Sequence, residues 1–260
     1  MSTEFFRIRM NFIKEKKYKK YFVFAIGEML LIIIGIIVAL QIDNWSEYQK
    51  ERKSERQVLS EIRDNLKYDL MDFEDNITHL QNINTSSKSL LRVINDDTPY
   101  NVSFGYFFSY LSGFPHFSCK TNGYSLLQSK GLEIILNDTL RKYITDLYED
   151  HYQYILTLEK ERINYNITLL EDAMKPYMGI NSMPIDDLPK SIIIKGGVKP
   201  LVDFGVFRNI RNYDHLKKDE DIQSMIKNVE IWTSAILVLH SSVENNIKDL
   251  ILLIEQELEE

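Results

Sequence analysis

The residues with reactive side chains are sparse and match no catalytic or metal-binding motif. Five histidines occur, at positions 79, 116, 151, 215 and 240, and no two are spaced one helical turn apart. His116 and Cys119 offer two metal ligands, but a zinc site needs more than two and no third lies nearby in the sequence. A thiol flanked by aromatic residues is more often part of a core. We therefore expect no metal, no cofactor and no catalytic residue.

Three further patterns resemble chemical motifs only in part. Glu149, Asp150 and His151 combine acids with an imidazole, but adjacent helical residues point in different directions. Residues 203–205 read Asp-Phe-Gly without the other elements of a kinase. Residues 195–199 are glycine-containing and basic but lack the Ser/Thr of a phosphate loop. We expect His151 and His240, which lie beside apolar stripes, to be hydrogen-bonded core residues.

Composition excludes several classes of protein. The 260 residues are 44% hydrophobic and 12% aromatic, which is enough to form a core and argues against disorder. A single cysteine excludes an intramolecular disulfide framework. The net charge of −7 argues against nucleic acid as a partner, because a nucleic-acid binder needs a basic face.

Residues 22–42 form an apolar run with one ionisable group, Glu28. As a helix this run would be about 30 Å long, which matches the hydrocarbon core of a bilayer. Tyr21 and Trp45 would lie at its two ends as interfacial anchors. A cleaved signal peptide has a shorter apolar stretch, and a cut after Ala39 would place bulky Ile37 at the −3 position. The run is therefore interpreted as an uncleaved signal anchor.

The flanking charges predict the orientation of this anchor. Residues 1–20 carry seven Lys/Arg against two Glu, whereas the cations that follow the span are interleaved with acids. Positive flanks stay in the cytoplasm. We predict a basic cytoplasmic tail at 1–20, a transmembrane helix at 21–42 and an extracytoplasmic domain at 43–260, which places the protein in a bacterial inner membrane with a periplasmic domain.

Glu28 is unusual because a carboxyl group in hydrocarbon is unfavourable unless it is neutral, hydrogen-bonded or able to reach the interface. Gly35 and Ala39 fall on the same side of a helix as Glu28 and form a small-xxx-small pair that admits a second helix. We consider three roles for Glu28: helix–helix contact, snorkelling to the interface, and a proton or ion path. The small residues favour an intramembrane contact face of Glu28, Gly35 and Ala39.

Several stretches resemble a family of uncharacterised single-pass membrane proteins from Bacteroidetes. The stretches near the N-terminus are 6–9, 25–28, 39–41 and 44–47, together with Gly35, and a second region of likeness comprises 129–132 and 137–141. Asp43 stands where the family pattern has Asn. The resemblance implies a single span and an inner-membrane location, and it implies no reaction.

Apolar periodicity predicts an all-α fold. Three long helices are expected at 43–94, from Asn137 to before Pro176, and at 219–258. Each has one apolar stripe, so we predict an elongated antiparallel bundle, with 222–253 forming mainly its core and in part a coiled-coil seam. The connections should hold short helices at 104–111 and 124–136, and a small hairpin or irregular excursion at 192–202.

These features predict a non-enzymatic single-pass membrane protein whose bundle binds a membrane or periplasmic protein, or a second copy of itself. The alternative is an extracytoplasmic module that senses a small molecule and acts through a separate partner. A bundle with elaborate connections can enclose a pocket, here expected from residues 100–135 and 178–218.

Overall fold

The computed structural model describes residues 18–101, 104–182 and 206–259, and the fold is all-α as predicted. The first helix, α2, runs from Tyr18 to Asn95 without interruption. The chain divides into two compact units, which comprise residues 1–55 and residues 56–260. In the first unit, the described residues all belong to α2, including the whole predicted membrane span.

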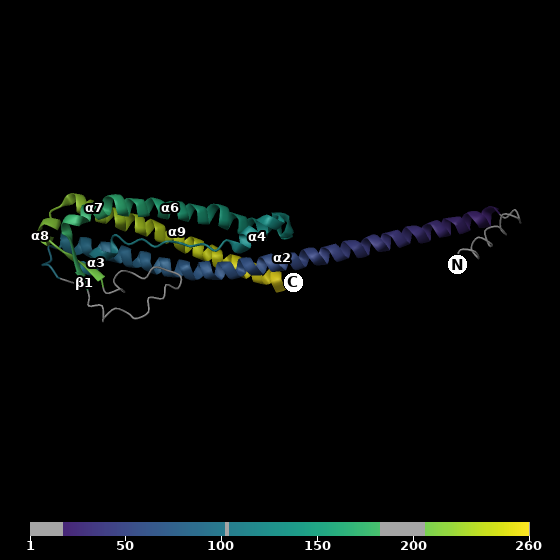
Figure 1. The fold of residues 1–260 in the computed structure, drawn as a ribbon, viewed down its shortest axis with the longest axis horizontal. Helices are drawn as coiled ribbons and strands as arrows, with labels where there is room; N and C mark the ends of the chain where they lie inside the picture. The colour runs from purple at the N-terminus through teal and green to yellow at the C-terminus, as the bar shows by residue number, and fades with distance from the viewer. Residues whose placement is uncertain (1–17, 102–103, 183–205, 260) are drawn as a thin grey trace. The chain divides into compact units, whose positions relative to one another are not determined.

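The second unit contains three long helical stretches that lie side by side (Figure 1). They are the part of α2 after Glu55, the run from Asp138 to Met174, and α9 from Glu220 to Glu259. The middle stretch comprises α5 (Asp138–Thr145), η2 (Asp146–His151), α6 (Tyr152–Tyr165), η3 (Asn166–Leu170) and α7 (Glu171–Met174). Both η2 and η3 are π-helical turns, each wider than an α-helical turn.

The ends of these helices follow from their capping residues. The side chain of Asn137 accepts a hydrogen bond from the Leu140 amide at the start of α5, as expected of an N-cap. Asp219 accepts hydrogen bonds from the amides of Asp221 and Ile222 at the start of α9. Pro176 lies in a 3₁₀ turn (η4, Lys175–Tyr177) directly after α7, so the predicted stop before this proline is confirmed.

The directions of the helices differ from a simple antiparallel bundle in one respect. Helix α9 runs opposite to α2, because Lys67 pairs with Glu255 while Asn84 bonds to Ser234. The α5–α7 stretch runs in the same direction as α2. Its beginning lies against the first half of this part of α2, where Tyr152 bonds to Asp69, and its end packs in the same cluster as the last turns of α2. The connection from residue 96 to 137 must therefore return along the length of the bundle.

That connection contains α3 (Phe104–Tyr110), α4 (Asn122–Lys130) and a short 3₁₀ turn (η1, Leu132–Ile134), close to the predicted short helices. Residues 113–121 between α3 and α4 have no regular secondary structure. Gly123, in the first turn of α4, lies directly against the backbone of α2, since a Cβ added at this position would lie 2.7 Å from the Ile62 nitrogen. Only glycine permits this approach.

The second connection is pinned by a two-stranded antiparallel sheet. Strand β1 (Met178–Ser182) pairs with β2 (Val206–Ile210), with Met178 opposite Ile210 and Ser182 opposite Val206. A short helix, α8 (Tyr213–Leu216), follows β2. The hairpin expected at 192–202 falls outside the described residues, and the observed strands were not predicted.

The core of the second unit consists of two apolar clusters at successive levels of the bundle. One is built from residues of α2 up to Phe73, from α5–α6 up to Ile155 and from α9 beyond Val243. The other takes α2 from Ile83 onward, together with α3, α7 and the first turns of α9. Polar side chains are buried at the level of the first cluster, where Asp69 and Asp72 lie, and between the two levels, where Glu159 lies.

Candidate functional site

The predicted intramembrane face lies on a fully exposed stretch of helix. Every residue from Glu28 to Trp45 is exposed, and a Cβ added at Gly35 would meet no atom within 4 Å. Because Gly35 and Ala39 follow Glu28 by seven and eleven residues on one continuous helix, the three share a face. Trp45 is 65% exposed, and Tyr21 belongs to the same helix. Contact of this face with another helix stays a prediction.

A second candidate site lies inside the bundle, where carboxylates hold an irregular segment. The amides of Ser118 and Lys120 donate to Asp72 and Asp69 of α2, at 2.9 and 2.8 Å. The amide of Phe117 donates to Glu159 of α6 at 2.9 Å. The amide of Gly123 donates to Asn65 at 2.9 Å. We call these four acceptors, Asn65, Asp69, Asp72 and Glu159, the amide clamp.

The clamp works because helix spacing matches the alternation of an extended chain. Neighbouring residues of an extended chain point their N–H groups to opposite sides. Accordingly the amide of Phe117 reaches α6, whereas those of Ser118 and Lys120 reach α2. The α2 acceptors are spaced four and three residues apart and so share one face of the helix. Side chains of two helices therefore take the place of neighbouring strands.

Burial perturbs the acidity of the clamp. Removal from water raises the pKa of Asp69 to about 7, although hydrogen bonds from the Lys120 amide and the Tyr152 hydroxyl oppose this shift. Burial likewise raises the pKa of Glu159 to about 7, against the hydrogen bond from the Phe117 amide. Burial also raises the pKa of Asp72, which accepts from the Ser118 amide. All three carboxyl groups hold protons more readily than exposed acids do.

Aromatic rings line the same region. Tyr152 is fully buried and donates its hydroxyl proton to Asp69 at 2.9 Å. The rings of Tyr124 and Tyr148 stack with their centroids 4.5 Å apart, and the Tyr124 hydroxyl donates to Glu149. Cys119 is partly buried beside them, and burial raises the pKa of its thiol. A thiol held in its protonated form is a poor nucleophile, so the partly buried Cys119 suits packing better than reaction.

The histidines expected from the sequence occupy different environments. His240 is fully buried, as predicted, but neither ring nitrogen has a hydrogen bond among the described residues. The predicted hydrogen-bonded state of His240 is therefore wrong for this structure, because Oε1 of Glu159, which approaches its Nε2, stays 3.6 Å away. His151 is half-buried and lies 3.4 Å from the Asn246 amide. Near the other end of the bundle, His215 contacts the Tyr177 hydroxyl at 2.8 Å.

His116 and Cys119 do not form a metal site in the described part of the chain. His116 approaches Glu159 instead, at 3.5 Å, and is 64% exposed. No group of three or more His, Cys, Asp or Glu side chains is arranged to hold a metal within residues 18–101, 104–182 and 206–259. The glycine-containing patterns at 195–199 and 203–205 fall outside those ranges.

A surface cleft of about 770 Å³ lies between the α5–η2 stretch and the C-terminal part of α9. Its walls combine apolar Leu252 and Leu253 with polar Asp146 and Asp249, and the π-helical turn η2 forms one side. This cleft is not lined by the ranges 100–135 and 178–218 from which a pocket was predicted. A smaller cavity of about 490 Å³ does take part of its lining from the first range, including Cys119 and Tyr124. Residues 183–205 of the second range fall outside the described residues.

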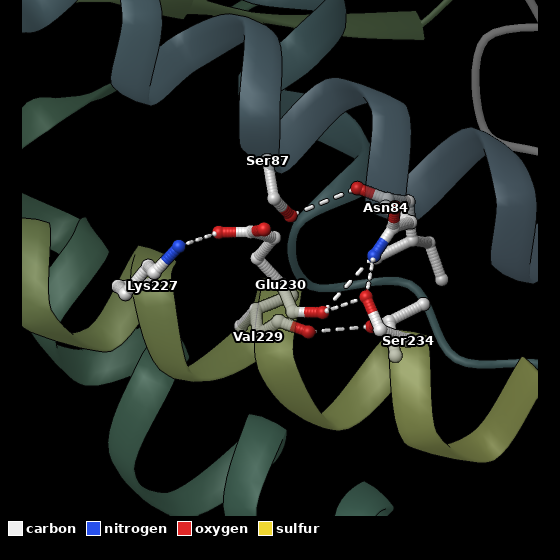
Figure 2. Close-up of polar contacts among 8 residues, drawn as sticks. Asn84, Ser87, Lys227, Val229, Glu230 and Ser234 are labelled. Atoms are coloured by element: carbon white, nitrogen blue, oxygen red, sulfur yellow. Dashed lines mark hydrogen bonds and ion pairs between the residues drawn. The ribbon is translucent and has the colours of Figure 1, made fainter.

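Helices α2 and α9 are joined by a polar contact away from the clamp. Asn84 of α2 points at α9 and donates to the Glu230 carbonyl at 3.0 Å and to the Ser234 hydroxyl at 2.7 Å (Figure 2). On the α9 side, Glu230 also pairs with Lys227 (Figure 2). This contact fixes the register of the two antiparallel helices.

A family model described as a family of unknown function (DUF6090) matches residues 28–175. The chain belongs to this family. The match covers more than half of the chain and includes α2 from Glu28, the clamp residues and the α5–α7 stretch. No curated protein and no solved structure matches the chain. The predicted membership of an uncharacterised family is thus confirmed at the level of a DUF6090 domain.

The clamp residues of this DUF6090 protein were not singled out from the sequence. Asn65, Asp69 and Asp72 do carry a signal, because polar residues recur at helical spacing beside the apolar stripe of Leu66 and Phe73. That pattern is ordinarily read as a solvated flank. Glu159 gave no such signal, since it stands in the sequence between Leu158 and Lys160 and resembles an ordinary exposed acid of a helix.

Replacing Asp69 with Asn should flatten the pH dependence of stability. The pKa of Asp69 is raised from 3.8 to about 7, so its contribution is fully present below pH 3.8 and is lost as the pH rises through 7. Asn keeps the acceptor for the Lys120 amide without this loss. Relative to the wild type, the variant should gain roughly 2–4 kcal/mol between pH 4 and pH 8, as a shift of about 3 pKa units implies.

The measurement is thermal unfolding of the full-length chain in detergent, followed by circular dichroism from pH 4 to pH 8. Asp150→Asn is the matched control, because Asp150 is exposed on the same bundle. An Asp69→Asn protein that retained the wild-type pH dependence would contradict the burial argument.

Proposed function

We propose that this chain is a non-enzymatic single-pass protein of a bacterial inner membrane, whose periplasmic helical domain binds a protein partner or a second copy of the chain. Among the helices that the structure describes, one, beginning near the N-terminus, is long and apolar enough to cross a membrane. The exposure of its apolar stretch carries the proposal. The protein buries apolar side chains in the two clusters of its second unit. In the apolar stretch of α2, by contrast, no residue is buried.

Lipid is the covering that best fits this stretch. Side chains such as Leu31 and Val23, exposed at 72% and 70%, would each be unfavourable in water. A helix satisfies its own backbone hydrogen bonds, so it can enter hydrocarbon without protein neighbours. The basic residues of 1–20 favour a cytoplasmic N-terminus and hence a periplasmic domain.

The face of Glu28, Gly35 and Ala39 supports a contact within the bilayer. Gly35 has open space where a side chain would be, so a second helix can approach its backbone closely. A neighbouring helix would also offer the Glu28 carboxyl group a hydrogen-bond partner in place of water. The non-enzymatic part of the proposal is supported by the clamp, since its carboxylates are engaged with backbone amides rather than directed at a substrate cavity.

Gly35→Ile and Glu28→Leu should weaken intramembrane association. The first blocks close approach of helices and the second removes the polar contact. Chemical crosslinking of the full-length chain in native membranes should show the crosslinked species reduced about fivefold or more, equivalent to about 1 kcal/mol. Gly27→Ile is the matched control, because Gly27 lies about 100° around the helix from Glu28. An equal yield of the crosslinked species in all three variants would contradict the proposed contact face.

The orientation is tested by fusing alkaline phosphatase, which is active only in the periplasm, after Glu260. The fusion should be active, and β-galactosidase, which is active only in the cytosol, should be inactive when fused at the same position. Activity of the β-galactosidase fusion alone would reverse the proposed topology. Loss of both fusions from the membrane fraction would instead contradict the anchor.

Small-molecule sensing is the second candidate, favoured by the cleft beside η2. Its volume of about 770 Å³ falls in the range of ligand sites, and π-helical turns are common at functional sites. If a ligand occupies the cleft, chain purified from native membranes should release it on denaturation, as detected by mass spectrometry. Leu253→Trp should abolish its recovery, and Val238→Trp, an exposed position on the same helix, should not. Identical extracts from both variants would count against sensing.

A further inference from the structure

The level between the two apolar clusters is a polar layer formed by all three long helices. Its buried polar residues are Asn76 on α2, Glu159, Arg162 and Asn166 on α6, and Thr233 and His240 on α9. Five buried side-chain atoms lack a hydrogen-bond partner among the described residues, and all belong to this layer or border it. They are Asn76 Nδ2, His79 Nδ1, Glu159 Oε1, and both ring nitrogens of His240.

Glu159 and His240 are the closest acid and base in this layer. Oε1 of Glu159 lies 3.6 Å from Nε2 of His240, and the two side chains are 1% and 0% exposed. The His240 ring packs against Phe73, with ring centroids 5.2 Å apart. The two groups face one another away from water, and a movement of about 0.6 Å would bring them within hydrogen-bond distance.

His116 connects this buried pair to solvent. Its Nδ1 lies 3.5 Å from the other oxygen of Glu159, Oε2, and its side chain is 64% exposed. The next residue, Phe117, donates its amide to that same Oε2 at 2.9 Å. Glu159 therefore touches the clamped segment, the surface imidazole and the buried imidazole at once.

We propose that Glu159 and His240 form a buried proton-binding site, filled from solvent through His116, whose occupancy controls how firmly residues 113–121 are held in the bundle. With the proton bound, the pair is neutral and Oε1–H of Glu159 donates to Nε2 of His240. With the proton released through His116 to water, Glu159 is a carboxylate, and the neutral imidazole changes tautomer, its ring proton passing from Nδ1 to Nε2, so that Nε2–H donates to Oε1. Only protons move, so no oxidant or reductant takes part.

Release of the proton loosens the segment chiefly because it leaves a charge on the buried Glu159, and this charge regains water when the segment opens. The hydrogen bond from the Phe117 amide opposes this effect, and like charge on Asp72 adds to it. On α2, Asp72 itself acts on Asp69 with like charge, and Asp75 acts on Asp72. Lys120 of the segment and Arg162 of α6 are the nearby cations, and Arg162 is held between the rings of Tyr165 and Trp232. His79 on α2 is the remaining titratable group of the layer, and burial lowers its pKa. A charged Glu159 therefore repels the carboxylate that holds the neighbouring amide.

The acidities agree with a site that fills near neutral pH. Burial raises the pKa of Glu159 to about 7, so its stabilising contribution is present below pH 4.5 and is lost as the pH rises through 7. Burial lowers the pKa of His240 to about 4, so its contribution is present above pH 6.5 and is lost as the pH falls through 4. The neutral pair is favoured in the mildly acidic range between these limits.

The first test is NMR of the full-length chain in detergent micelles, labelled with ¹³C and ¹⁵N in histidine. The His240 ring is identified by its contact with Phe73. The chemical shifts of this ring should change in one step near pH 7 as the neighbouring Glu159 carboxyl group loses its proton. The ring itself should stay neutral through this step. Glu159→Gln should remove the step, and Glu149→Gln, an exposed acid bonded to Tyr124, should keep it. A step that survives Glu159→Gln, or no step in the wild type, overturns the proposal.

The second test is hydrogen exchange of residues 113–121 in the wild-type chain, corrected for the intrinsic effect of pH. Exchange should be about tenfold faster at pH 8 than at pH 6, which corresponds to a change of one pKa unit. The midpoint should coincide with that of the His240 step, a comparison that needs no variant. Exchange that is flat across this range, or midpoints more than about one unit apart, contradict control of the segment by this site.

Discussion

A backbone amide taken out of water must find an acceptor, and residues 113–121 cross this bundle with neither a helix nor a neighbouring strand to supply one. The amide clamp meets that requirement with side chains of α2 and α6. Other features follow from it. The connection can return along the bundle, which allows α2 and α5–α7 to run in the same direction, and α4 can begin against the backbone of α2 at Gly123.

The clamp costs free energy of hydration, but it fixes the position of residues 113–121. Buried carboxyl groups lose hydration, as the raised pKa of Asp69 and of Glu159 shows. In exchange, each acceptor fixes the position of one amide, so a slide by one residue would turn the amides of Phe117, Ser118 and Lys120 away from their acceptors. The contact of Asn84 with Glu230 and Ser234 fixes α2 against α9 in the same manner. Apolar packing alone would tolerate several registers, whereas these polar contacts select one.

The parts of the fold that depend on local sequence could be predicted, and the parts that depend on which surfaces meet could not. The apolar run ending at Ile42, the capping role of Asn137 and the break at Pro176 are local signals, and each was recognised. The parallel direction of α2 and α6 depends on the path of a segment with no periodicity. Asp69 and Asp72 look like solvent-facing residues until that path is known. His240 was correctly placed in the core, but its partner, Glu159, is on another helix, and no spacing within one helix reveals a contact of that kind.

The π-helical turn η2 has a bearing on how such a chain can vary in length. A π-turn arises when a helix accommodates one additional residue without breaking. If one residue of Asp146–His151 were deleted, the helix could close into ordinary α-helical geometry, because the wider turn holds the extra residue without rotating the helix that follows. Tyr152 and Glu159 would then keep their inward direction. The turn is thus a place where this helix can gain or lose one residue while the same side chains still enter the core.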